Sequence, residues 1–414
     1  MDLNQKEIDA LRRLGEEYLS AATLPVQKEK VTLWKALNHG KMRRPMVVID
    51  QLPMNELNGN GELTCTVQSD LYWQGVEFGL RQSLYCWNHF PVDMVLNPFI
   101  EIPLVIENTG YGVFVQEDVL FSDESSNIVS HRFENQFQTM EDIKKIKDMR
   151  IIHHSAESAR RFEEAKEIFG SLPLRQSGIS SFHLGPWDTL STLMGIDNIY
   201  FALIDQPELL HAAMTRMTDS ILGALRDINE QGLYNTGATV CHCSYLFDDN
   251  LLPAPGLGKE PYTKNGWGFG LAQLFTSVSP DVTKEFEIPY ITKMAKEFGG
   301  IYYGCCDRLD DRLDLIKTIP NLRKVSCSPW SDKKHFAENI GDKLVMSYKP
   351  NPAFLAAETV DESAIEKDLR ETVELARSLN VNLEMILKDL STVQYQPERI
   401  TRFHEIAMKI VETY

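Results

Sequence analysis

The sequence is short of positive charge. Its 414 residues include 42 lysines and arginines against 59 aspartates and glutamates, which gives a formal net charge of −17 at pH 7. Proteins that bind nucleic acid or anionic membranes rely on an excess of basic side chains, so this balance argues against both kinds of partner. It also argues, more weakly, against a polyanionic substrate.

Long apolar segments are absent too. No apolar run approaches the roughly 20 residues that a membrane-spanning helix needs. Residues 1–5 (MDLNQ) are polar and acidic, which does not fit a secretory signal. The chain has only seven cysteines, and several follow predicted strands, as is typical of reduced thiols rather than of a disulfide framework. We therefore expect a cytoplasmic protein.

A glycine-rich phosphate loop is the third absence. No Gly-x-Gly-x-x-Gly follows the first predicted strand, which argues against a dinucleotide-binding sheet. Instead the chain alternates eight apolar segments with helical ones. The apolar segments are residues 44–51, 91–97, 173–182, 237–245, 300–307, 324–328, 343–348 and 382–387. This count predicts an α/β fold of the (β/α)₈ TIM-barrel type.

The predicted domain organisation is simple, because no break in composition divides the chain. Residues 1–40 read as two amphipathic helices that form an N-terminal helical cap. Residues 41–414 form the barrel. Within it, alternation of apolar and polar residues predicts a small antiparallel insertion at about 107–138.

Residues 300–307 (GIYYGCCD) are the stretch on which the functional prediction centres. The strand is apolar and then stops at Cys305, Cys306 and Asp307. Barrel enzymes keep their chemistry at the carboxyl ends of their strands. Adjacent cysteines can offer a thiolate to a metal or to an electrophile. The alternative is that both are small buried apolar side chains.

Four stretches in the right order carry a family resemblance. They are residues 184–190 with 205–210, residues 279–280 with 286–290, residues 300–307, and residues 396–399. Together they resemble the uroporphyrinogen decarboxylase superfamily, over about residues 30–414. That superfamily includes zinc-dependent methyltransferases, which exchange methyl groups with corrinoid proteins. The resemblance implies a TIM barrel and an active site at its carboxyl end.

The departures from the decarboxylase pattern argue against one activity of the superfamily, the decarboxylation of uroporphyrinogen. Where the decarboxylase has an Arg-Gln pair after the first strand, this chain has Asp50-Gln51. A carboxylate there would repel a polycarboxylate porphyrinogen. The position of the decarboxylase's catalytic aspartate falls at about Glu101. We therefore do not expect the protein to decarboxylate uroporphyrinogen.

The resemblance also implies a metal site, although only one of the three ligand types, the cysteine at Cys305, matches. The methyltransferases' His, Cys and late Cys ligands fall on Tyr303, Cys305 and approximately Asp389. His242, at the end of a predicted neighbouring strand, is the candidate that replaces the missing histidine. The predicted Zn²⁺ ligands are therefore His242, Cys305 and Asp389, and a slip in the alignment would bring in Lys388 or Glu384 instead.

The remaining candidates are assigned from their places at predicted strand ends. The predicted catalytic residues are Asp50, Tyr303 and Asp307, although Asp50 and Asp307 also suit helix caps and Tyr303 also suits packing at the barrel top. The predicted substrate-binding residues are Asn97, Glu101, His183 and Tyr348.

The sequence thus predicts a methyltransferase that moves a methyl group between a small substrate and a corrinoid protein, assisted by Zn²⁺. The corrinoid would come on a partner, since no cobalamin-binding segment is evident. A homodimer is also compatible with the sequence. Two alternatives stay open: a decarboxylase or lyase acting on a small acid that is not a porphyrin, and a non-catalytic binding protein on the same barrel.

Overall fold

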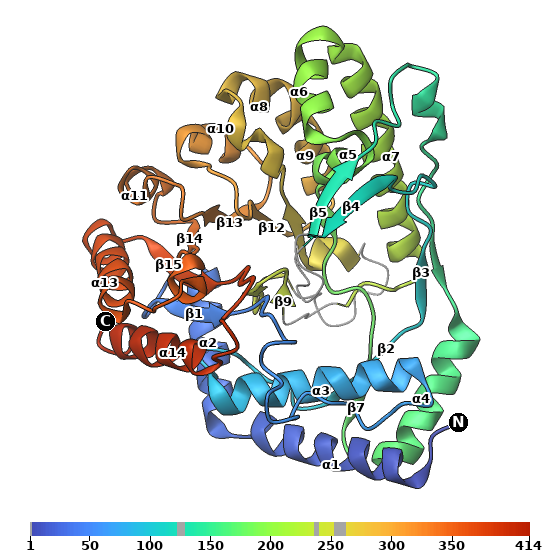
Figure 1. The fold of residues 1–414 in the computed structure, drawn as a ribbon, viewed down its shortest axis with the longest axis vertical. Coiled ribbons are helices and arrows are strands. Elements are labelled where there is room, and N and C mark those ends of the chain that lie inside the picture. Colours follow the sequence, from blue (N-terminus) through green and yellow to red (C-terminus); the bar gives the residue numbers. More distant parts are fainter. Residues whose placement is uncertain (1, 122–128, 236–239, 252–261) are drawn as a thin grey trace.

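The centre of the structure is a sheet of seven parallel strands, in the order β1-β15-β14-β13-β12-β11-β8 (Figure 1). The structure is a computed structural model that describes residues 2–121, 129–235, 240–251 and 262–414. The strands are β1 (Met46–Ile49), β8 (His183–Leu184), β11 (Trp267–Gly270), β12 (Gly300–Tyr303), β13 (Leu322–Cys327), β14 (Val345–Tyr348) and β15 (Asn382–Leu387). The prediction of an α/β fold built on a parallel sheet is confirmed. Closure into an eight-stranded barrel stays a prediction.

Both faces of this sheet are buried. Successive side chains of a strand point to opposite faces, so Phe269 and Tyr302 face an inner core, whereas Ile301, Tyr303 and Val325 face an outer core. Burial on both faces explains why these strands read as nearly continuous apolar runs.

Helices supply the other side of the outer core. Each contributes buried apolar side chains to it. These helices are α5 (Pro186–Met194), α6 (Ile196–Asp205), α7 (Pro207–Glu230), α8 (Pro280–Phe286), α9 (Ile288–Ala295), α10 (Leu313–Ile316), α11 (Lys333–Ile340), α12 (Ala353–Ala356), α13 (Glu362–Leu379) and α14 (Glu398–Val411). Short 3₁₀ turns lie at η1 (Asp142–Lys145), η2 (Tyr262–Asn265), η3 (Gln273–Ser277) and η4 (Asp310–Arg312).

The N-terminal helices have two different roles. Helices α1 (Gln5–Ala22), α3 (Leu71–His89) and α4 (Ser155–Phe169) lie side by side and share a second core (Figure 1). Helix α2 (Pro25–Asn38) instead inserts Trp34 into the inner core. The Trp34 ring stacks on Tyr245 at 5.1 Å between ring centroids. The first forty residues therefore contribute to two separate cores.

Four two-stranded sheets accompany the central one. Strands β2 (Ile100–Pro103) and β7 (Leu174–Ser177) pair in parallel. The antiparallel pairs are β3 (Ile106–Asn108) with β6 (Ile151–His153), β4 (Glu117–Phe121) with β5 (Val129–Phe133), and β9 (Val240–Cys241) with β10 (Ser244–Tyr245). The pair β4–β5 lies where the sequence predicts an antiparallel insertion.

The prediction of a second strand at residues 91–97 is wrong. The structure assigns no strand there, although the Asp93 amide donates one hydrogen bond to the Val47 carbonyl of β1. The reason is the Asp93 side chain, whose carboxylate accepts from the Val47 amide at 2.8 Å and from the Arg44 guanidinium. A side chain thus occupies the donor that a neighbouring strand would have used.

The fourth predicted strand, residues 237–245, is also wrong. Its described part is the short β9–β10 hairpin, and β11 takes the place in the sheet between β8 and β12. The sequence around β11 is rich in glycine, a composition typical of loops, so its pattern does not indicate a strand. These glycines allow close packing, because a Cβ on Gly268 would lie 2.8 Å from the Phe298 ring.

The structure also bears on membranes. Among the helices in the described part of the chain, none is both long and apolar enough to cross a bilayer.

Candidate functional site

The candidate site is built where β12 and β15 end. Gly304 follows β12 with a φ of +90°, a conformation that favours glycine, and Cys305 and Cys306 come next. Lys388 and Asp389 follow β15, and Asp389 has a φ of +58°. A left-handed backbone at a residue other than glycine costs free energy and often marks a functional site.

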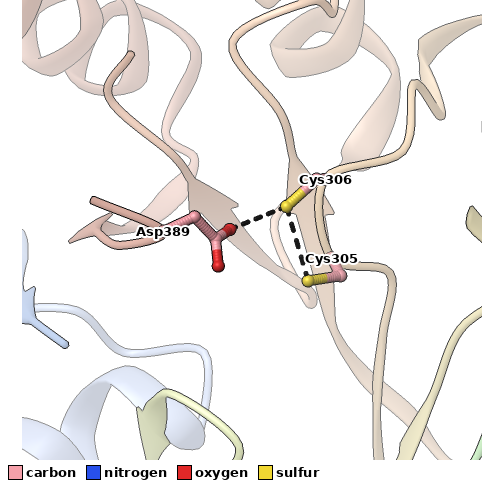
Figure 2. Close-up of side chains that lie close together, drawn as sticks. All are labelled: Cys305, Cys306 and Asp389. Carbon is pink, nitrogen blue, oxygen red and sulfur yellow. Dashed lines mark hydrogen bonds between the residues drawn. The ribbon is translucent and has the colours of Figure 1, made fainter. Parts of the chain in front are cut away.

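The two sulfur atoms and the Asp389 carboxylate lie together (Figure 2). Cys305 Sγ is 3.6 Å from Cys306 Sγ. The Cys306 thiol donates a hydrogen bond to Asp389 Oδ2 at 2.8 Å. Cys305 is 6% exposed, while Cys306 is half-buried and Asp389 is exposed. The cluster is therefore anchored in the protein and open on one side.

The β9–β10 hairpin brings His242 to this cluster. His242 occupies the turn with a φ of +53°, and its ring stacks on Phe269 at 4.1 Å. Its Nε2 lies 3.6 Å from Cys305 Sγ. All three predicted metal ligands, His242, Cys305 and Asp389, thus come from different parts of the chain to one place.

Lys388 lies among these groups. Its Nζ is 2.8 Å from Cys305 Sγ, 3.0 Å from His242 Nε2 and 3.2 Å from Asp389 Oδ2. The side chain is almost fully buried. Its ammonium therefore supplies positive charge at the point where the ligand atoms converge.

These contacts change the protonation of the site. Hydrogen bonds from Cys306 and His242, and the Lys388 charge, lower the pKa of the Cys305 thiol well below its ordinary value, against the opposing effect of burial. The same pairing raises the pKa of Cys306. Cys305 is therefore the thiolate and Cys306 the thiol, whose single proton can lie toward Cys305 Sγ or toward Asp389 Oδ2.

His242 is basic as well. Burial opposes its protonation, but hydrogen bonds to the sulfur atoms of Cys243 and Cys305 raise the pKa of His242 to about 9. Because only a neutral imidazole nitrogen can bind a metal, coordination at His242 has to displace a proton.

Cys305, Cys306 and Asp389 form a possible metal site, although Cys306 Sγ and Asp389 Oδ2, at 2.8 Å, would have to separate to share an ion. Tetrahedral zinc with Zn–S near 2.3 Å and Zn–N near 2.0 Å separates neighbouring ligand atoms by roughly 3.5–3.8 Å. The Cys305–Cys306 and Cys305–His242 separations are both 3.6 Å. Ligand atoms of Cys305, Cys306 and Asp389 all lie within 4.8 Å of one another. Cys306 is thus a ligand candidate beyond the three that the sequence predicts, and Lys388 has to move aside for an ion to bind.

Two of the predicted catalytic residues lie beside this cluster. Asp50 follows β1, and burial raises its pKa while the charges of His242 and Lys388 oppose the shift. Asp307 accepts a hydrogen bond from the Cys305 amide at 2.7 Å and is buried, which raises its pKa to about 6. Asp307 therefore fixes the turn that carries Cys305, in place of the helix cap considered from sequence.

Two predicted site residues lie on the opposite face of the sheet. The Tyr303 hydroxyl donates to Glu287 Oε1 at 3.0 Å, and the Tyr348 hydroxyl donates to Asp368. Both rings belong to the outer core. The reason is strand alternation, which turns Tyr302 rather than Tyr303 toward the inner core.

Asn97 and Glu101 also lie apart from the sulfur cluster. They line a different cleft, of about 620 Å³, between α3 and β2. Asn97 Nδ2 donates to Glu101 Oε1 at 3.0 Å. Because residues 91–97 do not form a strand of the central sheet, these two side chains do not reach its carboxyl end.

His183, the remaining predicted residue, is adjacent to the cluster. Its ring centroid lies 5.7 Å from that of His242 and 5.1 Å from that of Phe269. His183 is exposed and lines a cleft of about 690 Å³. The structure therefore brings His183, His242, Cys305 and Asp389 to one region of the sheet.

Comparisons with known proteins add a fold likeness. No protein-family model matches the chain, and no curated protein matches it. A solved structure described as a methyltransferase from Methanosarcina mazei is similar, with a TM-score of 0.53 and 12% sequence identity. The match covers 92% of this chain and 98% of that one. At this identity the likeness shows a shared fold, over nearly the whole of both chains.

Proposed function

We propose that the protein is a methyltransferase of the uroporphyrinogen decarboxylase superfamily, which moves a methyl group between a small substrate and a corrinoid carried by a partner protein. The observation that carries the proposal is the Cys305 thiolate among Cys306, His242 and Asp389, a set that suits Zn²⁺. The fold shared with a methyltransferase supports it.

Each residue of the site has a role in this proposal. Cys305, Cys306 and Asp389 would hold the zinc and leave its fourth position open to the substrate, with His242 beside Cys305 as the alternative third ligand. Zinc bound there would supply Lewis acidity toward the heteroatom of the substrate, and the corrinoid would supply the donor or acceptor of the methyl group. Asp307 holds the Cys305 turn through the backbone amide.

The position of His183 suggests how the substrate approaches. It is exposed on the open side of the cluster, against the ring of His242. Its pKa is lowered by burial of part of the ring and by the charge of His242. A neutral His183 is suited to accept or donate a hydrogen bond at the heteroatom from which the methyl group leaves.

Metal analysis tests the proposal directly. Wild-type protein supplied with zinc is expected to retain one ion per chain after desalting. Cys305→Ala is expected to lower the zinc affinity by roughly tenfold or more, because the remaining ligands cannot complete the shell. Cys327→Ala is the matched control, since Cys327 is a buried cysteine of β13 in the outer core; it should leave the bound zinc unchanged.

One observation favours a second reading. Lys388 already compensates the Cys305 thiolate at 2.8 Å without a metal. If zinc-supplied wild type holds no metal, and Cys305→Ala behaves like wild type, the zinc methyltransferase is excluded. A metal-independent decarboxylase or lyase acting on a small acid, or a binding protein, then becomes the better interpretation.

A further inference from the structure

The cleft beside His183 has the size of a small-molecule site. Its volume is about 690 Å³, within the roughly 300–1,000 Å³ that is usual for such sites. It lies between β8, the start of α5, the β3–β6 pair and α7. None of its lining residues was predicted from the sequence to bind a ligand except His183.

Most of the lining is apolar. The apolar side chains are Ile106, Tyr111, Met149, Ile151, Ile179, Phe182, Pro186, Ile221 and Leu271. Two of them, Tyr111 and Phe182, are aromatic, and aromatic side chains attract organic cations at their ring faces. The walls therefore suit the apolar body of a ligand, and the ligand's charge has to be recognised by the few polar groups.

Those polar groups carry negative but no positive charge. The lining has one carboxylate, Asp188, and no lysine or arginine among the residues that the structure describes. Gln273 donates to both oxygens of Asp188, from its amide and from its side chain, each at 2.9 Å. No described lysine or arginine forms an ion pair with Asp188. Burial raises the pKa of Asp188, and the two hydrogen bonds from Gln273 oppose this rise and fix the position of the carboxylate.

The groups around Asp188 do not make the cleft positively charged. The buried acids Glu287 and Asp307 both interact electrostatically with Asp188. His183 is the one basic side chain among the described residues that line the cleft. A carboxylate or phosphate ligand would be repelled by Asp188 and would meet no lysine or arginine among the described lining residues, whereas an ammonium group would gain an ionic partner.

The cleft also adjoins the sulfur cluster. His183 lines it, and the His183 ring lies 5.7 Å from that of His242, whose Nε2 is 3.6 Å from Cys305 Sγ. A ligand in the cleft is thus separated from the thiolate by this pair of imidazoles.

We propose that this cleft binds the substrate and that the substrate is an organic cation with an apolar body, an amine or a quaternary ammonium compound, whose positive group lies against Asp188. Because a cationic nitrogen has no lone pair for a metal, the heteroatom that zinc would polarise is another atom of the same ligand. The role of this ligand as a substrate rests on the proposed methyl transfer. The binding itself requires neither zinc nor a corrinoid.

Three probes that share a benzyl or phenyl group test the proposal by calorimetry on metal-free protein. Benzyltrimethylammonium is cationic, benzyl methyl ether is neutral and benzoate is anionic. We expect the cation to bind about tenfold more tightly than the ether, which corresponds to one ionic contact in a partly solvated site. Benzoate should bind most weakly. Equal or tighter binding of benzoate would overturn the assignment of charge.

Two pairs of variants locate the site. Asp188→Asn should weaken binding of the cation about tenfold and leave the ether unchanged, and the retained ether binding shows that the variant is folded. Glu101→Gln, in the cleft between α3 and β2, should change neither. Thr189→Phe should block both probes, because Thr189 is an exposed lining residue of α5, whereas Thr32→Phe, at an exposed position of α2, should not.

The outcomes separate this inference from the proposed function. Loss of cation binding in Glu101→Gln but not in Asp188→Asn would place the site in the other cleft and refute the proposal. Probe binding without zinc retention would leave this inference standing and remove the methyltransferase. Zinc retention without cation preference would do the reverse.

Discussion

Two lysines point to the inner face of the central sheet, and their surroundings differ sharply. Lys324 of β13 is fully buried and contacts Glu384 of β15, with 2.7 Å between Nζ and Oε2. It also donates to Ser244 Oγ at 2.6 Å. Lys388 lies four residues beyond Glu384, and it meets a thiolate, an imidazole and the exposed carboxylate of Asp389.

The difference separates a structural ion pair from a reactive one. The partners of Lys324 come from a strand of the sheet and from the β9–β10 hairpin, and they leave no room for a ligand. The partners of Lys388 come from segments that follow strands or lie in turns, and two of them, His242 and Asp389, have left-handed backbones. The Lys324–Glu384 pair is thus fully buried, whereas the partners of Lys388 are placed where a ligand could replace the lysine.

The fully buried Lys324–Glu384 pair should give the largest effect on stability. Lys324→Met leaves the Glu384 carboxylate without its ammonium in a fully buried site. Loss of one partner of such a pair costs about 3–5 kcal/mol. Urea unfolding followed by circular dichroism measures the change.

The matched double variant checks the cause. Lys324→Met with Glu384→Leu removes both charges and should recover most of the lost stability, because an apolar pair of similar volume packs without desolvation of an ion. If the double variant is as unstable as Lys324→Met, packing rather than charge accounts for the loss.

The positions of the strands could be predicted only where the sequence has an unbroken run of apolar residues. Strands β1, β12, β13, β14 and β15 lie where the sequence predicts them, because burial on both faces requires such runs. The second and fourth predictions failed at Asp93 and at the glycines of β11. In each case a specific tertiary contact, a side-chain hydrogen bond or close ring packing, overrides the local pattern.

The sequence predicted where His242, Cys305 and Asp389 lie but not the cation beside them, and the binding of a metal by these residues stays a prediction. His242, Cys305 and Asp389 meet as expected, whereas Lys388 was only an alternative to Asp389. Alternation along β15 turns Glu384 and Lys388 to the same face, and this was the available signal. Tyr303 was misplaced because β12 is apolar on both faces, so its sequence does not show which tyrosine points inward.

Glu287 is a buried acid that, unlike Glu384, has no lysine beside it in the part of the chain that the structure describes. Its replacement should give the second largest change in the free energy of unfolding. Glu287 is fully buried; Oε1 accepts from Tyr303, and Oε2 has no hydrogen-bond partner among the described residues. Burial, with smaller contributions from Asp188 and Asp307, raises the pKa of Glu287 well above its ordinary value. The folded protein therefore favours the protonated acid.

The sign of the pH dependence follows from that shift. The stability due to protonated Glu287 is fully present below its ordinary pKa of 4.5 and is lost as pH rises toward the folded value. Glu287→Gln cannot ionise, so we expect it to match wild type near pH 5 and to exceed it by about 1–3 kcal/mol at pH 8. Urea unfolding across this pH range gives the difference; a constant difference would mean that Glu287 does not titrate there.

The open cluster should show the smallest change in stability and a clear change in reactivity. Lys388→Met removes the cation from Cys305, but Cys306 and His242 still donate to the sulfur. We expect a loss of about 1–2 kcal/mol in unfolding free energy, and a thiol pKa for Cys305 that moves back toward the ordinary value near 8.5.

In metal-free wild type, alkylation of Cys305 by iodoacetamide should keep nearly the same rate from pH 8 to pH 6, because the thiolate is already formed. In Lys388→Met the rate should fall with the pH, while Lys388→Arg should keep the wild-type profile. Mass spectrometry assigns the modified cysteine, and half-buried Cys65, whose pKa is raised by burial, serves as the internal reference for a thiol that stays protonated in this range. If Lys388→Met and wild type share one profile, the ammonium at 2.8 Å does not hold the thiolate, and the contrast between the two lysines loses its chemical basis.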